Sequence, residues 1–447
     1  MNMRRLMRLA AIAITPAMML GACGDWLTEP DAVDNPNQPT EATPDQLLVG
    51  SETALALQYT SDLARTVCMW MQQCAGTARQ YLQVGTYTYG EDAYNAPFTQ
   101  VYVGGGLLDI RKVQDAADEA GDEITGGIAR VLEALHVGIA ADIWGDIPYT
   151  EAITESNEPV LDPQEQVYNA IQAKLDTAIT LLTSAQGLGP GTADLFYGGD
   201  PTKWLRLAHT VKARYWLHVA ERLGQTAYAN ALTEAQQGLQ QGDDLRTFQA
   251  ENPQSHNAWY QFIVIQRAGD IGTGAFLVNL MKARNDPRLD EYFDLNSAGQ
   301  YQGATPGQAQ SAAISPFDAA RIDPAFRQPI VTWEENQLII AEAALQTGDA
   351  TLARNAVNAV RQSVGLPPLG SVTLADIMTE KYIALFQNPE VWNDWKRTCL
   401  PPLQSAATGQ PIPGRLLYAQ SERNTNTNIP LPGDQPARNW NDPNPCP

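Results

Sequence analysis

Residues that could perform catalysis are present, but they do not form a known catalytic arrangement. The sequence has no GxSxG nucleophile turn, no HExxH zinc motif, no phosphate-binding loop and no dinucleotide fingerprint. The run Gly104-Gly105-Gly106 lacks a following Lys-Ser/Thr, so it does not predict a phosphate site. The four histidines are scattered, and the first lies beside an apolar helix stripe typical of a core residue: His136, His209, His218 and His256. We therefore expect no catalytic residue, no metal and no cofactor.

One catalytic alternative stays open because carboxylates are abundant. The chain has 50 acidic residues, which supply many accidental pairs. Glycoside hydrolysis needs two carboxyl groups about 5 to 9.5 Å apart across a cleft, and sequence alone does not test that spacing. A glycoside hydrolase is therefore kept as an alternative function.

Aromatic and polar side chains gather in two segments without helical periodicity. Residues 81–98 carry several tyrosines among Gly, Thr and Asn, and residues 250–271 combine aromatic, amide and charged groups. Aromatic rings can stack on the apolar face of a sugar, while short polar groups bind its hydroxyls; the same mixture suits peptides. The alternative is that these rings only pin the loops to the body of the protein. The predicted ligand-binding residues are Tyr87, Tyr89, Tyr94, Trp259, Tyr260, Arg267 and Asp270.

The N-terminus has the features of an export signal. Arg4, Arg5 and Arg8 precede an apolar stretch from 9 to 22, which is too short to span a bilayer, and the sequence Leu-Gly-Ala-Cys ends at Cys23. This ending resembles the bacterial lipobox, in which the cysteine is acylated after cleavage. We expect a signal peptide at 1–22, a lipid on Cys23 and a Pro- and Asp-rich tether at 23–45. An ordinary signal peptide cleaved near Ala22 is the alternative.

The remaining four cysteines predict two disulfides. An even number of cysteines in an exported chain favours disulfides, and three pairings are possible. We favour Cys68–Cys74 and Cys399–Cys446, because the second pair would hold a proline-rich tail. Zinc is the alternative, and the spacing and the few histidines argue against it.

The charge of the chain excludes one class of partner. Removal of residues 1–22 takes away three of the 29 basic side chains and none of the 50 acidic ones, which leaves a formal charge of −24. Such a field repels phosphate backbones, so no nucleic-acid partner is expected. No later stretch is apolar enough to predict a transmembrane helix.

Helical periodicity dominates the rest of the chain and predicts an all-α fold. Apolar stripes at helix spacing run through 128–143, 204–219 and 374–386. Asp162-Pro163 and Asp200-Pro201 each read as an N-cap followed by proline. The segment 331–366 reads as two helices joined at Gly348-Asp349, like a tetratricopeptide hairpin. Further helices are expected at 46–60, 62–75, 99–119, 165–183, 226–240, 272–284, 332–346 and 350–363, with long irregular segments at 81–98, 185–200, 243–271, 296–330 and 400–447.

Several motifs, in order, resemble the SusD/RagB family of lipoproteins, in particular its nutrient-binding SusD-like branch. They are ADIWGDIPYTEA (141–152), GDPTKWLRLAHTVKAR (199–214), NDPRLDEYF (285–293), EENQLIIAEAALQTGD (334–349), VWNDWKRT (391–398) and PGRLLYAQSERNTN (413–426). The resemblance extends from the lipobox to the tail. It implies a tetratricopeptide-like fold of helical hairpins with long loops, formed by one domain over 46–447.

The resemblance also implies a function. It predicts a lipid-anchored protein on the cell-surface side of the outer membrane that captures an oligosaccharide or peptide nutrient. The ligand would be delivered to a partner, a SusC-like TonB-dependent transporter. A ligand-free interaction scaffold that uses the tetratricopeptide-like surface is the second alternative function.

The motif residues themselves favour structural roles. Gly145, Asp146 and Pro148 are typical of a corner that ends a helix. Asp286 and Arg288 predict a buried ion pair rather than a ligand contact. Trp392 and Trp395, three residues apart, share one helix face and predict core packing. All three assignments rest on residue type and spacing.

Overall fold

The computed structural model describes residues 42–407 and 409–446. The predicted signal peptide, the predicted lipidation site Cys23 and the predicted tether up to residue 41 lie outside the described residues. The first helix, α3 (Pro44–Thr60), begins within the last residues assigned to the tether. The described chain is mostly helical with a few short strands, so the predicted all-α, tetratricopeptide-like fold class is confirmed.

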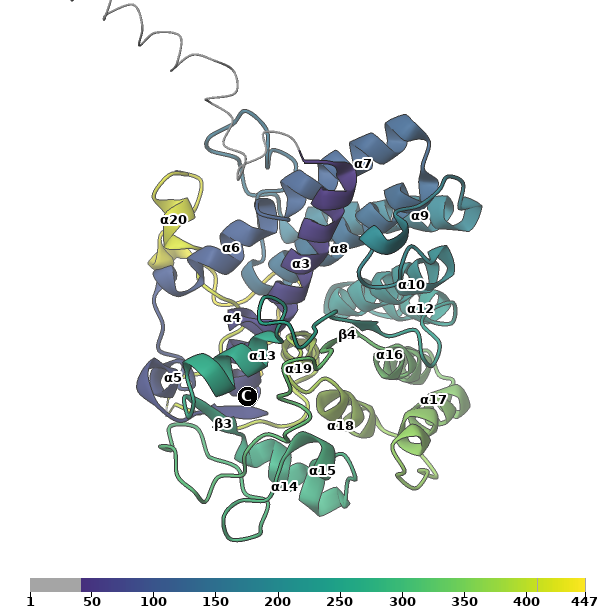
Figure 1. Cartoon of the computed structure of the whole chain (residues 1–447). Coiled ribbons are helices and arrows are strands. Elements are labelled where there is room, and N and C mark those ends of the chain that lie inside the picture. The colour runs from purple at the N-terminus through teal and green to yellow at the C-terminus, as the bar shows by residue number, and fades with distance from the viewer. Residues whose placement is uncertain (1–41, 408, 447) are drawn as a thin grey trace, which may run out of the picture.

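One half of the molecule is a series of helices packed in chain order (Figure 1). Each helix contacts the next, and α16 also contacts both α17 and α18. The apolar stripes in the sequence are the buried faces of these helices. The series comprises α7 (Leu107–Ala120), α8 (Glu123–Trp144), α9 (Gln164–Ser184), α10 (Pro201–His218), α12 (Gln225–Ala235), α16 (Trp333–Gln346), α17 (Ala350–Ser363) and α18 (Leu374–Ala384).

Helix α8 forms the centre of this series. Within the described residues it is the one helix long and apolar enough to cross a bilayer, and 94% of its most apolar window is buried inside the protein. Gly138 lies at its middle, where the Tyr215 hydroxyl occupies the space of a side chain and donates to the Ala134 carbonyl at 3.0 Å. A glycine is required there because a Cβ would lie 1.9 Å from the tyrosine oxygen.

The predicted helix at 99–119 is wrong, because the structure breaks it into two. Helix α6 (Asn95–Tyr102) ends before the three glycines, and α7 begins after them. Gly105 has a positive φ and packs directly on α3, where a Cβ would lie 2.3 Å from the Gly50 carbonyl oxygen. The glycine run therefore serves a close approach between segments. Helix α4 (Asp62–Trp70) is also shorter than the predicted 62–75.

The second half of the molecule is built from short elements and long irregular segments, of which α5, α13 and β3 lie at the lower left of Figure 1. Strand β3 (Ile271–Thr273) occupies the start of the helix predicted at 272–284, so the observed helix α14 begins only at Ala275. The elements of this second half are β1 (Cys74–Gly76), α5 (Arg79–Val84), η2 (Glu91–Tyr94), β2 (Leu245–Arg246), α13 (Ala258–Tyr260), the π-helical η4 (Gln261–Gln266), β3 (Ile271–Thr273), α14 (Ala275–Arg284), α15 (Leu289–Tyr292) and β4 (Pro329–Val331). The remaining short elements are η3 (Gly191–Ala193), α11 (Ala220–Leu223), α19 (Glu390–Thr398), α20 (Gln420–Arg423) and η5 (Pro432–Asp434).

The two proline-flanked N-caps have different outcomes. Asp200 accepts hydrogen bonds from the backbone of Thr202 and Lys203 and caps α10 as predicted. Asp162 does not cap α9, whose N-cap residue is Pro163. Its carboxylate instead accepts the backbone N–H groups of Tyr149 and Thr150 at 2.9 Å each, because residues 147 and 162 pair in an antiparallel bridge.

Both disulfides favoured by the sequence are present. Cys68 pairs with Cys74, and Cys399 pairs with Cys446 over a sequence separation of 47 residues. The second bond joins the end of α19 to the C-terminal tail.

Candidate functional site

A small antiparallel sheet joins the two loops that the sequence predicted to bind ligand. Strands β1 and β3 pair with Gly76 opposite Ile271, so α5 leaves the sheet where the 250–271 segment enters it. The Thr77 N–H donates to the Asp270 carbonyl at 2.8 Å, and the Tyr81 ring meets the Phe262 ring edge to face at 5.1 Å. Segments about 180 residues apart therefore lie side by side (Figure 1).

The three predicted tyrosines of the first loop mostly serve packing. Tyr87 and Tyr89 pack against the buried Trp70 ring, and Tyr89 also contacts Tyr94. Tyr94 is 3% exposed, and its hydroxyl shares a hydrogen bond with the Thr66 hydroxyl. Tyr87 is 9% exposed, and its hydroxyl accepts a hydrogen bond from the Ala406 N–H. Tyr87 and Tyr94 are therefore corrected from ligand contacts to packing residues; Tyr89 remains partly exposed.

The second loop requires a similar correction. Trp259 and Asp270 are 0% exposed, so neither ring face nor carboxylate is accessible to a ligand. Trp259 lies on α13 where that helix meets α3. Asp270 forms an ion pair with Arg79 and fixes the junction of the two loops. The alternative interpretation, that loop aromatics pin the loop to the body, holds for Trp259.

We define the loop surface as five of the accessible side chains around this junction: Arg79, Tyr81, Tyr260, Gln266 and Arg267. Tyr81 and Tyr260 are partly exposed, and the Arg79 side chain is 53% exposed. Burial raises the pKa of the Tyr81 hydroxyl, while the charges of Arg65 and Arg267 act to lower it. The loop surface thus combines two phenol rings, two guanidinium groups and an amide.

Only Tyr260 and Arg267 of the loop surface were predicted as site residues. Arg79 and Gln266 have no sequence pattern that singles them out, and Tyr81 was passed over within its segment. For Arg79, the backbone conformation is a further feature that the sequence does not reveal. Arg79 and Tyr87 both have φ in the left-handed region, at 50° and 69°, a strained geometry that concentrates at functional sites.

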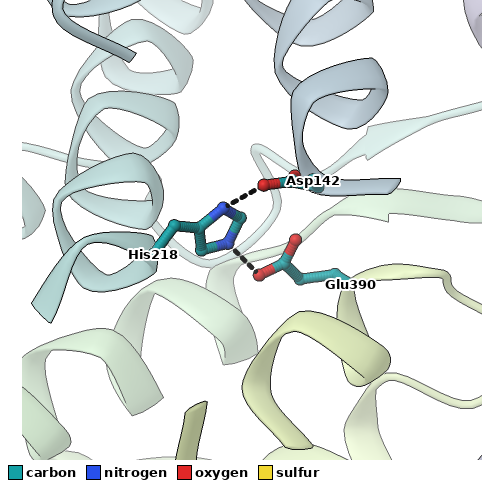
Figure 2. A group of neighbouring side chains, drawn as sticks. All are labelled: Asp142, His218 and Glu390. Atoms are coloured by element: carbon teal, nitrogen blue, oxygen red, sulfur yellow. Dashed lines mark hydrogen bonds and ion pairs between the residues drawn. The ribbon is translucent and has the colours of Figure 1, made fainter. Parts of the chain in front are cut away.

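A second cluster lies inside the protein and joins three helices (Figure 2). His218 of α10 contacts Asp142 of α8 through Nδ1 at 2.8 Å and Glu390 of α19 through Nε2 at 2.6 Å. Burial alone would lower the pKa of His218, but the two carboxylates raise it to about 9. His218 is therefore an imidazolium that donates from both nitrogens.

This buried triad has the residue types of a metal site. Both ring nitrogens of His218 are engaged with carboxylates of the triad. Asn393 donates to Asp142 Oδ2 at 3.1 Å and to Glu390 Oε2 at 3.0 Å, which occupies the outer carboxylate oxygens. The arrangement holds α8, α10 and α19 together.

Sequence and structure comparisons identify the family. Residues 36–366 match the SusD-like family model, whose description is starch-binding associating with outer membrane. The chain belongs to the SusD-like family. No curated protein matches the sequence.

Solved SusD-like structures share this fold over most of their length. A chitin-binding protein is 22% identical, with a TM-score of 0.77 over 90% of this chain and 100% of its own. A SusD/RagB family protein from Bacteroides thetaiotaomicron is 19% identical, with a TM-score of 0.74 over 91% and 98%. A chitin-binding SusD homolog from Flavobacterium johnsoniae is 19% identical, with a TM-score of 0.72 over 89% and 99%.

The SusD-like motifs have the structural roles expected of them. Gly145 has a positive φ at the end of α8, and Asp146 Oδ1 accepts the Gln164 N–H at 2.8 Å. Asp286 and Arg288 form a buried ion pair at 2.6 Å. Trp392 and Trp395 are buried in the core, as is His136, whose pKa burial lowers to about 4.

The buried triad gives this SusD-like protein a defined pH dependence. The pKa of His218 is about 9 in the folded state against an ordinary value of 6.5, so its stabilisation is full below pH 6.5 and is lost as pH rises through 9. We expect the free energy of unfolding to fall by up to about 3 kcal/mol across this window. Urea unfolding at a series of pH values measures it.

The control separates His218 from other titrating groups. His218→Gln should flatten the pH dependence between 6.5 and 9, whereas His256→Gln, in an irregular segment, should retain it. An unchanged pH profile in His218→Gln would contradict the assignment.

Proposed function

We propose that this protein binds an oligosaccharide at the loop surface, with starch or chitin fragments as the first candidates. The observation that carries the proposal is the pair of accessible tyrosines, Tyr81 and Tyr260, beside the exposed Arg79, Gln266 and Arg267. Phenol rings stack on the apolar face of a pyranose, and guanidinium and amide groups donate to its hydroxyls. The family description and the names of the two chitin-binding relatives support a glycan.

The wider role follows from the family. We propose that the protein is anchored in the outer membrane through acylated Cys23, faces the medium and delivers its ligand to a TonB-dependent transporter. Binding without catalysis fits this role. The His218 triad is closed to substrate, because its three residues are at most 3% exposed. Incubation with the same glycans should release no product, and purification from membranes should recover the transporter.

Two substitutions test the loop surface. Tyr81→Ala and Tyr260→Ala should each weaken oligosaccharide binding by about fivefold, since one stacked ring contributes on the order of 1 kcal/mol. Isothermal titration calorimetry with maltooligosaccharides and chitooligosaccharides measures the affinity.

A tyrosine outside the loop surface provides the control. Tyr228 is partly exposed on α12, within the helical series, and Tyr228→Ala should leave the affinity unchanged. Wild-type affinity in both Tyr81→Ala and Tyr260→Ala would refute the loop surface as the binding site.

A further inference from the structure

The C-terminal tail and the corner after α8 enclose a cavity of about 460 Å³ that is separate from the loop surface. This volume lies within the range of about 300 to 1,000 Å³ that is typical of small-ligand sites. Its walls carry three aromatic residues, Trp144, Tyr418 and Trp440, together with Leu161 and several prolines. The tail is held in place by the Cys399–Cys446 disulfide.

Three arginines and one carboxylate line this cavity. The arginines are Arg222, Arg415 and Arg438, and the carboxylate is Asp146. Arg438 pairs with Asp442 at 3.1 Å. Over residues 42–407 and 409–446, neither Arg222 nor Arg415 has a carboxylate within 4 Å. The chain as a whole has 50 acidic and 29 basic side chains, so two unpaired arginines in one cavity are a marked local excess of positive charge.

The hydrogen bonds of these two arginines leave binding capacity unused. Arg222 is exposed and donates from Nε to the Trp440 carbonyl, and its two Nη atoms have no partner among the described residues. Arg415 is 6% exposed and donates only to the backbone carbonyls of Trp144 and Pro436, while its buried Nε has no partner. Neutral carbonyls satisfy part of each guanidinium but do not balance its charge.

Aromatic rings hold the guanidinium groups in place. The Arg222 guanidinium lies 5.4 Å from the centre of the Trp440 ring, and that of Arg415 lies 4.6 Å from the Tyr418 ring. Stacking on a ring fixes the plane of a guanidinium, and in Arg222 it leaves the two Nη atoms free to donate to a carboxylate or sulfate.

We propose that this cavity is a second binding site, which takes a sugar bearing a carboxylate or sulfate group. Arg222 binds the anionic group, the buried Arg415 adds positive charge to the wall of the cavity, and the apolar lining beside Trp440 receives the ring. That the anionic group belongs to a sugar rests on the proposed function. That the cavity prefers an anionic ligand rests on its arginines alone.

The test compares one disaccharide in charged and uncharged forms by calorimetry on the purified protein. Digalacturonate should bind, its dimethyl ester should bind at least tenfold more weakly, and the affinity for digalacturonate should fall as NaCl is raised. A sulfated disaccharide tests the second anion, and acetate tests whether a carboxylate without a sugar is sufficient. Binding of acetate as tight as that of digalacturonate would overturn the sugar assignment.

Arg222→Gln should weaken digalacturonate binding at least tenfold, and Arg222→Lys should restore part of it. The matched control is Arg327→Gln: Arg327 is also exposed and also donates from Nε to a backbone carbonyl, that of Thr247, but it does not line the cavity. Equal affinity for acid and ester, no effect of Arg222→Gln, or no binding of either anionic disaccharide would overturn the proposal. Uncharged glycans at the loop surface should bind Arg222→Gln normally, so the two sites fail or succeed separately.

Discussion

Replacing Glu380 with glutamine is expected to lower the free energy of unfolding by about 3 to 5 kcal/mol, because it breaks a buried ionic network. Glu380 of α18 is fully buried and accepts from three arginines: Arg284, Arg288 and Arg361. Asp286 is the second carboxylate of this network and pairs with Arg288 at 2.6 Å. Although burial opposes it, hydrogen bonds from Arg288 lower the pKa of Asp286.

The reason for the large effect is charge balance. In Glu380→Gln three guanidinium groups face a single buried carboxylate, and an uncompensated buried charge is strongly destabilising. The network also joins the Asp-Pro-Arg turn before α15 to α17 and α18, so its loss should loosen the contact between the two halves of the molecule.

Chemical denaturation of the variant and a control measures this effect. Glu119→Gln removes the same charge from an exposed position on α7 and should change stability by less than about 0.5 kcal/mol. Similar losses in both variants would mean that net charge, rather than the buried network, sets the stability.

The second large effect is expected at the C-terminal disulfide. Replacing Cys399 and Cys446 with serine opens a loop with a sequence separation of 47 residues, which costs about 4 kcal/mol in the chain-entropy account. The Cys68–Cys74 bond closes a separation of only 6 residues, and its loss should cost about 2 kcal/mol.

The two double-serine variants are controls for each other. Denaturation of both should place the Cys399/Cys446 variant lower in stability, and only that variant should lose binding at the tail cavity. Equal destabilisation, or digalacturonate affinity unchanged by release of the tail, would contradict the role given to this disulfide.

Helix positions followed from sequence because they depend on local patterns. The stripe through Trp204, Val211 and Tyr215 became the buried face of α10, and Asp200 became its N-cap. Local patterns failed where a tertiary contact decided the outcome. The glycine run broke a helix because Gly105 packs on Gly50, and Asp162 turned from α9 to the backbone of Tyr149 and Thr150.

The candidate site was predicted at the level of segments and not of side chains. Both loops were identified from their composition, but composition does not distinguish a ring that faces solvent from one that faces the core. Trp259 is buried against α3, whereas its neighbour Tyr260 is partly exposed. The His218 triad was missed because its members come from three helices far apart in the sequence.

The claim that the loop surface binds glycan is tested most directly by hydrogen–deuterium exchange with and without maltooligosaccharides and chitooligosaccharides. Bound ligand should slow exchange in residues 79–94 and 254–271 together, because β1 and β3 join these segments into one surface. Residues 225–235 of the helical series should exchange at an unchanged rate. Protection that avoids both loops, or no protection by either glycan, would contradict the account.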